Sequence, residues 1–295
     1  VTCIMLWQHD INEKKPMIAL SSPDRSAVQL QLSDGTTISL VDALEVKECD
    51  GQKVATNDTM GIVYSAVQDN TLHEEEMIYN TVITPRGTEY LLTLSDGSKV
   101  WLNSDSRLKF PIKFSDKERR VELVGEGYFE VAKDTSSPFI VNSGELEVKV
   151  TGTSFNISVY PDENVLQATL VSGSVDVSCP SYPNIRSVSL VPNEIAVFHP
   201  GDQTIAKKQV DITPYIAWHD GFLTFHDERL GAIAKKLERW YDINFEFDDL
   251  KTEELIFYGT IRRHENISQV LEMLRCTNLI DFTIIDSKTV RVTRL

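Results

Sequence analysis

The residue types that most often perform catalysis are scattered through this 295-residue sequence. It contains no GxSxG nucleophile elbow, no GxxxxGK[ST] phosphate loop and no HExxH zinc motif. Gly125-Glu126-Gly127 begins like a dinucleotide fingerprint, but Glu130 stands where the third glycine belongs, and strand-like residues flank it. A phosphate-binding loop needs a helix N-terminus after it. These residues are therefore interpreted as a turn between strands.

Histidine and cysteine also lack the spacing of a metal or redox site. No two of the six histidines stand at i, i+2 or i, i+4, and His219 and His226 could share a site only if a hairpin brought them together. The four cysteines are Cys3, Cys49, Cys179 and Cys276. They form no CxxC or CxxxC pair, and we interpret them as buried small apolar residues, with one long-range disulfide left open. No cofactor or metal site is predicted.

Carboxylates and tryptophans leave a weaker case for carbohydrate chemistry. With 44 acidic residues, some carboxylate pair will lie at a glycosidase separation by chance, so a hydrolase has no specific support. Trp101, Trp218 and Trp240 could form a sugar-stacking platform. Trp240, however, continues an apolar helix face and is expected in the core, and Trp218 is expected as a buried plug at a hinge. The sequence predicts no enzyme.

Composition is that of a globular protein with an acidic surface. Hydrophobic residues make up 41% and charged residues 25%, and the net charge is −15. Such a charge disfavours nucleic acid and anionic membranes, which attract clustered lysine and arginine. The length favours two or three domains. No apolar run reaches the roughly 20 residues that span a bilayer, and VTCIMLW at the start is either a strand or the trailing edge of a membrane helix.

Short apolar alternations from about residue 27 to 210 predict an all-β half, as a sandwich, barrel or β-roll. Two near-identical hairpin signals stand 62 residues apart, QLQLSDGT at 29–36 and LLTLSDGS at 91–98. Asp-Gly favours a type I′ turn, which would set Leu92 opposite Trp101. The repetition suggests that the first 80 residues or so partly duplicate the unit that follows.

After Pro214 the spacing of the apolar residues changes from strand-like alternation to the three- and four-residue spacing of amphipathic helices. One helix is predicted over 227–241 with Asp227 as its N-cap, and a second begins at Asn266, with Gln269 completing a capping box. Strands are predicted at 222–225, 243–247, 256–261, 281–285 and 289–292. The region therefore consists of two β-α-β units on a small open sheet of five or six strands.

Seven strings carry a resemblance to a known family. They are TPRG (84–87), LSDGSKVWLN (94–103), RRVEL (119–123), GEGYFEVA (125–132), PFIV (138–141), GTSFN (152–156) and GSV (173–175). In this order they resemble the periplasmic part of FecR-like anti-sigma factors of the Bacteroidetes type. The chain from Trp218 onward is similar to the signalling domain of TonB-dependent transporters and to secretin N-terminal domains.

The resemblance implies a fold class and a division into domains. The fold is an all-β, sandwich- or β-roll-like FecR-type domain, followed by a small α+β domain of the secretin/TonB short N-terminal type. The expected segments are a membrane-proximal segment at 1–24, an N-terminal β segment at 25–80, the FecR-type domain at 81–212 and an α/β docking domain at 213–295.

The resemblance also implies a function. Such proteins are single-pass inner-membrane sensors whose periplasmic region receives a signal from a TonB-dependent outer-membrane transporter. They hold an extracytoplasmic-function sigma factor through a cytoplasmic region, and proteolysis frees it. This sequence has neither that region nor a complete membrane helix, so it is expected to be the soluble periplasmic part, which cannot itself bind the sigma factor. Its role is docking rather than catalysis.

The transporter's signalling domain is expected to dock on the C-terminal domain, through a sheet edge or the adjoining helix face, and the last predicted strand, 289–292, is one candidate edge. An open sheet can accept an extended partner strand at its edge, and basic side chains there would suit an acidic partner. The predicted interface residues are Lys288, Val290, Arg291, Val292 and Arg294. The alternative is that the all-β half binds a glycan and senses a nutrient directly. Calorimetry of residues 80–210 against polysaccharides would separate the two hypotheses.

Overall fold

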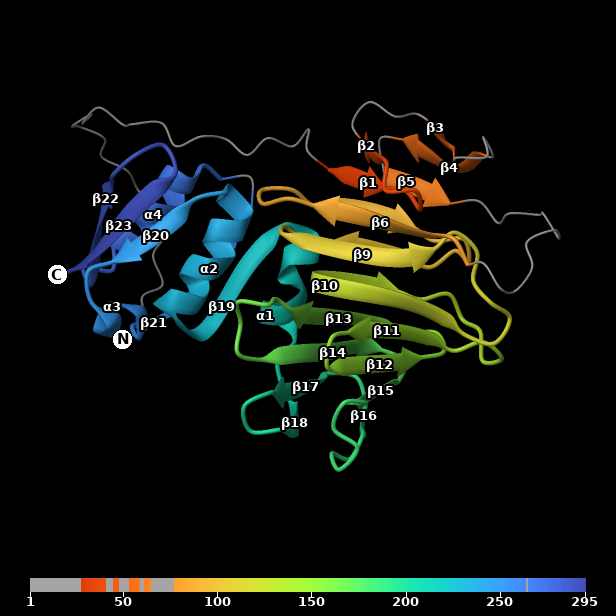
Figure 1. Ribbon diagram of the computed structural model, residues 1–295. Helices are drawn as coiled ribbons and strands as arrows, with labels where there is room; N and C mark the ends of the chain where they lie inside the picture. The colour runs from red at the N-terminus through yellow and green to blue at the C-terminus, as the bar shows by residue number, and fades with distance from the viewer. Residues whose placement is uncertain (1–27, 41–44, 48–52, 59–60, 65–76, 264) are drawn as a thin grey trace.

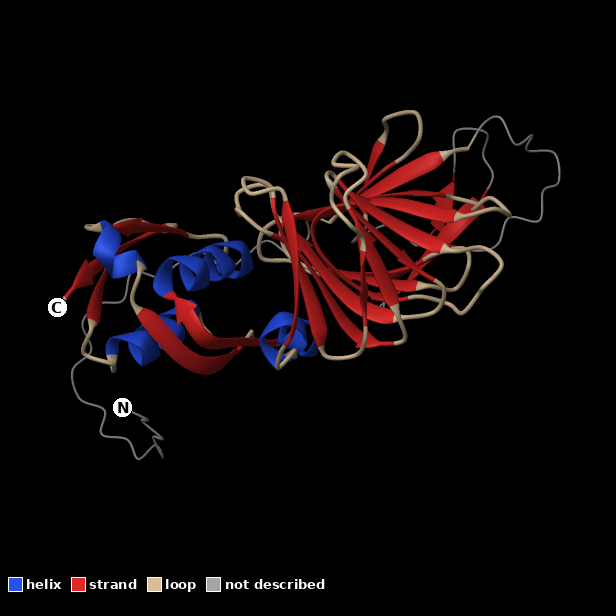
Figure 2. Cartoon of the chain, turned by 90° about the horizontal axis from the view of Figure 1, so that it is seen from below, coloured by secondary structure: helices blue, strands red, loops and turns tan. Residues whose placement is uncertain are grey.

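The computed structural model describes residues 28–40, 45–47, 53–58, 61–64, 77–263 and 265–295 (Figure 1). The segment at 1–24 and two of the cysteines, Cys3 and Cys49, lie outside these residues. A large β-structure is followed by a small domain with helices, which stands beside one end of it (Figures 1 and 2). The predicted fold class, all-β followed by α+β, is confirmed.

The β-structure is one curled sheet that folds into two layers, and β10 runs through both. In hydrogen-bonded order the first layer contains β2 (Thr37–Ser39), β1 (Gln29–Gln31), β6 (Tyr79–Thr84), β9 (Ser106–Pro111), β10 (Arg119–Glu130), β11 (Phe139–Ser143), β12 (Leu146–Val150), β15 (Val175–Ser178) and β16 (Val188–Leu190). The second layer contains β3 (Glu45–Lys47), β4 (Lys53–Asp58), β5 (Gly61–Tyr64), β7 (Tyr90–Thr93), β8 (Lys99–Leu102), the end of β10, β13 (Ser154–Val159), β14 (Leu166–Ser172), β17 (Glu194–His199) and β18 (Thr204–Gln209).

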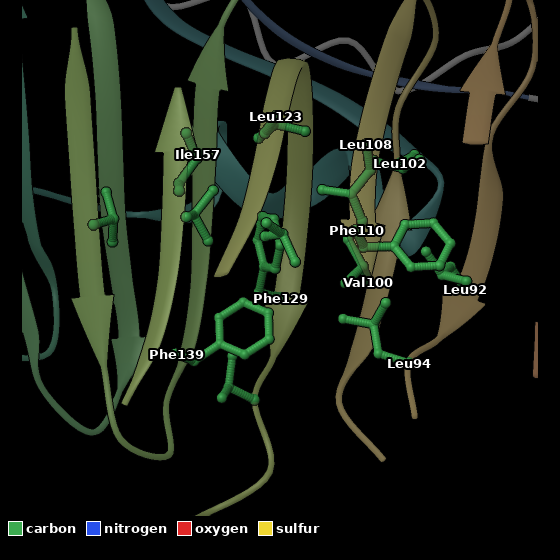
Figure 3. Close-up of a cluster of buried hydrophobic side chains, with 14 of the residues drawn as sticks. Leu92, Leu94, Val100, Leu102, Leu108, Phe110, Leu123, Phe129, Phe139 and Ile157 are labelled. Carbon is green, nitrogen blue, oxygen red and sulfur yellow. The ribbon is translucent and has the colours of Figure 1, made fainter. Parts of the chain in front are cut away.

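One hydrophobic core lies between the layers because the strands alternate buried and exposed residues. Leu108 and Phe110 enter it from the first layer and Leu92 from the second (Figure 3). Phe129 and Phe155 stack at its centre with ring centroids 5.0 Å apart. Residues 125–127 lie inside β10, so their interpretation as a turn was wrong.

The two hairpins share one geometry, but it is not the predicted type I′ turn. In each, a backbone bond closes a three-residue loop, Leu32 N to Thr36 O and Leu94 N to Ser98 O, and only the glycine of the loop has a positive φ. A three-residue loop shifts the register by one relative to a two-residue loop. Leu92 therefore lies opposite Val100 in the core, whereas Trp101 faces outward opposite Leu91.

The small domain begins with α1 (Thr213–Ile216) and a 3₁₀ turn, η2 (Ala217–Asp220), and then divides its strands between two sheets. One pairs β19 (Phe222–Arg229) with β21 (Ile256–Arg262), and the other has the order β20 (Asn244–Phe247), β23 (Thr289–Arg294), β22 (Ile280–Ile284). The helices are α2 (Leu230–Tyr241), α3 (Leu250–Glu253) and α4 (Ile267–Arg275). The prediction of a single open sheet of five or six strands is therefore wrong, since the strands form one sheet of two and one of three.

Local signals at the two long helices had different outcomes. The capping box of Asn266 and Gln269 is confirmed. Asp227, by contrast, does not cap α2: β19 continues past it through a bulge, where Asp227 has φ +50°, and Arg229 is the N-cap. Pairing with β21 thus holds these residues in the strand, and the N-cap of the helix lies two residues later than predicted.

Candidate functional site

The two parts of the molecule meet around the carboxylate of Glu126. Its Oε2 accepts a hydrogen bond from Asn103 Nδ2 at 2.8 Å, and its Oε1 accepts one from Asn156 Nδ2 at 3.0 Å. The three side chains come from neighbouring parts of the second layer, the end of β8, β10 and β13. Two neutral amides therefore hold both oxygens of one carboxylate.

Two tryptophans of the small domain complete this arrangement. Trp218 Nε1 donates to Asn156 Oδ1 at 3.1 Å, and Trp240 Nε1 donates to Asn103 Oδ1 at 3.3 Å. Both indoles are buried. Since each asparagine accepts from an indole and donates to Glu126, the bonds fix the orientation of both amides. The result is a symmetrical relay from Trp240 through Glu126 to Trp218, across the boundary between the domains.

Arg263 adds a cation to one arm of the relay. Its guanidinium donates to Glu89 Oε2 at 2.6 Å and to Ser104 Oγ at 2.9 Å. The same guanidinium lies 4.7 Å from the centroid of the Trp240 ring. The Arg263 side chain is buried whereas Glu89 is 43% exposed, so the pair lies at the rim of the junction with its cation facing inward.

Arg239 of α2 binds the β-structure through a second set of contacts. It donates to Glu163 Oε1 at 2.7 Å and to Asp162 Oδ1 at 2.8 Å, and its guanidinium lies 3.6 Å from the centroid of the Tyr160 ring. Its backbone carbonyl accepts from Gly87 N at 2.7 Å. Arg239 is buried, so this cation depends on its two carboxylates for compensation.

An aromatic group covers the edge of the junction. The His219 ring stacks on Tyr128 with centroids 4.3 Å apart and meets Trp101 edge-on at 4.6 Å. Tyr128 belongs to the core of the small domain although β10 supplies it, and Trp101 packs against the same core. The one-residue register shift of the β7–β8 hairpin is what turns Trp101 to this outer face.

The electrostatics of Glu126 are unusual. Burial raises the pKa of its carboxyl above the usual range, although the Asn156 and Asn103 amides favour the ionised form. Burial also raises the pKa of the neighbouring Tyr160 hydroxyl, which donates to Ser104 O at 2.9 Å. Within the described residues no cation forms an ion pair with Glu126, and the side-chain hydrogen bonds to its carboxylate come from neutral amides.

The backbone beside Glu126 admits only glycine. Gly125 has φ +94°, and a Cβ there would lie 2.3 Å from Ser106 Oγ and 2.8 Å from Ser106 Cα. Ser106 Oγ accepts a hydrogen bond from Glu126 N at 2.9 Å, and the close approach of Gly125 to Ser106 makes this hydrogen bond possible. Glu126 is placed by a strand that bends where it passes between the layers.

The sequence-predicted interface residues take no part in this junction. Val290 and Val292 are core residues of the small domain. Lys288 bonds to Asp242, and Arg291 lies 3.3 Å from Glu246 and 3.7 Å from Asp248. Arg294 is exposed. The prediction that this strand forms a sheet edge is wrong, since β23 lies between β20 and β22.

The other candidate residues are also separated. His219 stacks on Tyr128, whereas His226 lies 3.5 Å from Asp211, so the two histidines share no site. Cys179 is buried as predicted, but Cys276 is exposed. The described residues contain no group of three or more His, Cys, Asp or Glu side chains that could hold a metal ion.

Sequence reasoning missed the centre of the junction. Asn103, Glu126 and Asn156 each stand within one of the strings that carried the family resemblance, so the signal was present. It pointed to the family without indicating that these strings converge in space.

Across the described residues, no helix has the length and apolar character needed to cross a membrane.

Comparisons with known proteins give a consistent result. The FecR protein family model matches residues 80–176, and the model of the FecR C-terminal region matches residues 222–292. Two crystal structures of a candidate anti-sigma factor from Parabacteroides distasonis ATCC 8503, at 1.65 and 2.50 Å, are 26% identical to this chain with a TM-score of 0.67. They cover 73% and 74% of this chain and 99% of their own chains. No curated protein matches the sequence.

Proposed function

This chain belongs to the FecR-like anti-sigma factors, and we propose that it is the periplasmic region of a single-pass inner-membrane sensor. In this proposal it receives a signal from a TonB-dependent outer-membrane transporter and relays it to an extracytoplasmic-function sigma factor. The family is regulatory, and an anti-sigma factor has a sigma factor as its partner. The signal passes by protein docking and not by catalysis.

The observation that carries the proposal is an open strand edge in the small domain. In the described part of the chain β21 pairs with β19 alone, so the other edge of each strand is unpaired. Ile256 and Tyr258 on β21 are 49% and 65% exposed, and they alternate with buried Phe257. An extended partner strand could add to this edge and cover both side chains.

The junction around Glu126 supports the relay. A partner that docks on the small domain also acts on the β-structure, because Arg239, Trp218 and Trp240 tie the two together with buried bonds. Energetic coupling between the docking surface and the β-structure requires a continuous network of packed and hydrogen-bonded side chains between them, and these bonds provide one. The exposed face of β23, with Lys288 and Arg291, is the alternative docking surface that the test must separate from β21.

Binding of the transporter's isolated signalling domain to this chain tests the proposal. The double variant Ile256→Asp/Tyr258→Asp should weaken binding at least tenfold, measured by calorimetry, because it puts two charges into the partner's apolar contact. The control is Lys288→Glu/Arg291→Glu, which reverses charge on the other sheet and should change the affinity less than threefold.

Two outcomes decide the result. Loss of binding in the β23 control with full binding in the β21 variant would move the docking surface to the face predicted from the sequence. No binding of the unaltered chain to the signalling domain would overturn the proposed function itself.

A further inference from the structure

A cleft of about 960 Å³ lies between the two domains, with Glu126 and Asn156 among its lining residues. Residues of β19, α2 and α3 line it from the side of the small domain. Its volume is at the upper end of the range for ligand-binding pockets. Since Glu126 is only half-buried, its carboxylate can be reached from this space.

The charges that line the cleft do not balance. Seven carboxylates stand against four lysine and arginine side chains. Three of these cations are already paired: Arg239 with Asp162 and Glu163, Lys235 with Asp162, and Lys236 with Glu228. Among the described residues no ion pair is formed by four of the lining carboxylates, which are Glu126, Asp227, Glu253 and Glu254. The cleft therefore has a surplus of negative charge.

Glu126 lines this cleft with both of its carboxylate oxygens held in place by amides. Each of its oxygens accepts one amide hydrogen and keeps further lone-pair capacity. An ionised carboxylate removed from water is costly unless a cation compensates it. Lys236, whose charge acts on Glu126 through space, is 2.6 Å from Glu228 and is thus paired elsewhere. A cation that enters the cleft would gain an ion pair without breaking one.

The apolar lining sets a second requirement on the ligand. Leu250 is 79% exposed and Phe222 is 37% exposed, and both line the cleft. Large exposed apolar side chains beside unpaired carboxylates suit a chain segment that has both apolar and basic residues, and they suit a free metal ion poorly.

We propose that the cleft binds a segment of a partner protein that inserts a lysine or arginine side chain toward Glu126, with apolar neighbours against Phe222 and Leu250. The inference does not depend on the identity of that partner, and it stands whether or not a transporter domain docks at β21. The charge of the inserted group is the property that the cleft selects.

The test uses N-acetyl-arginine amide as the probe and N-acetyl-citrulline amide as its neutral isostere. Both are titrated into the full chain with ¹⁵N-labelled tryptophan, and the indole N–H resonances of Trp218 and Trp240 are followed by NMR. These indoles bond to the asparagines that hold Glu126. The arginine derivative should shift both resonances in a saturable way, with a Kd on the order of 1–10 mM for so small a fragment. The citrulline derivative should bind at least tenfold more weakly.

Variants locate the binding group. Glu126→Gln should weaken binding of the arginine derivative at least tenfold, whereas Glu130→Gln, an exposed carboxylate on the same strand, should leave it unchanged. Glu126→Gln also changes the hydrogen bonds of the junction, so the double variant Glu253→Gln/Glu254→Gln serves as an independent test. It should lower the affinity for the arginine derivative about threefold. Equal binding of the citrulline derivative, or unchanged affinity in both cleft variants, overturns the proposal.

Discussion

At the scale of single residues, the junction depends on which atom of each amide faces Glu126. The asparagine Nδ2 atoms point to the carboxylate and the Oδ1 atoms to the indoles of Trp218 and Trp240. Aspartate at either position would place a second carboxylate about 3 Å from the first, where like charges repel. Neutral amides are therefore the side chains that can bind a carboxylate and an indole at once.

The raised pKa of Glu126 makes a prediction about pH. Protonation of Glu126 is easier in the folded state, so its contribution to stability is present below the ordinary glutamate pKa of about 4.3 and is lost as the pH rises through the raised folded-state pKa. Glutamine does not titrate. The Tm of the unaltered chain minus that of Glu126→Gln should therefore be larger at pH 5 than at pH 8, by a few degrees.

Lys236 and Glu163 also act on Glu126 through space, and these interactions disappear with the carboxylate in Glu126→Gln. They have opposite signs, since Lys236 lowers and Glu163 raises the pKa, so burial, the largest cause of the shift, sets the sign of the Tm difference. A difference for Glu126→Gln that is constant or shrinks at low pH would contradict the account of its burial.

At the scale of elements, β10 connects the layers and the site. It pairs with β9 up to Val124, with β13 from Gly125 and with β8 from Gly127, so the strand changes layer at Gly125. A residue with a side chain would force Ser106 away and break its bond to Glu126 N. The bend in this strand is thus what brings Glu126 to the outer face.

We expect Gly125→Ala to lower the free energy of unfolding by roughly 3 kcal/mol or more, because the strain of a left-handed backbone and the steric clash with Ser106 are additive. Gly97→Ala is a matched control: Gly97 has φ +83° but nothing within 4 Å of its added Cβ, so about 1–2 kcal/mol is expected. Urea unfolding of both variants measures the difference. Equal losses would show that the close approach to Ser106 has no energetic weight.

At the scale of the whole molecule, the two domains share polar bonds and part of a core. Tyr128 of β10 is buried in the core of the small domain, and the cations Arg239 and Arg263 of that domain are buried against carboxylates of the β-structure. The arginines are buried while their carboxylate partners are partly exposed, so loss of a carboxylate would leave a buried cation without compensation. Because the domains share a core as well as these bonds, we expect them to unfold together.

The described contacts predict one cooperative unfolding transition for the whole chain in calorimetry. In the double variant Asn103→Ala/Asn156→Ala both indoles and Glu126 lose their partners, and the transition should separate into two, with the small domain melting first. Asn142→Ala on β11, in the first layer, should keep a single transition. Two transitions in the unaltered chain would mean that the junction does not couple the domains.

The sequence by itself determined the features that depend on neighbours along the chain. Alternation of apolar residues predicted the β half, helical spacing predicted α2 and α4, and the Asn266 capping box predicted where α4 begins. These features follow from backbone geometry and from bonds spanning a few residues.

Only the tertiary structure decided the rest. The strand order put β23 in the middle of its sheet, pairing with β21 delayed the start of α2, and a loop one residue longer than predicted turned Trp101 outward. The site itself joins residues as distant as Asn103 and Trp240, which are 137 positions apart. Such contacts arise when sheets curl and domains pack, and no local pattern of residues encodes that geometry.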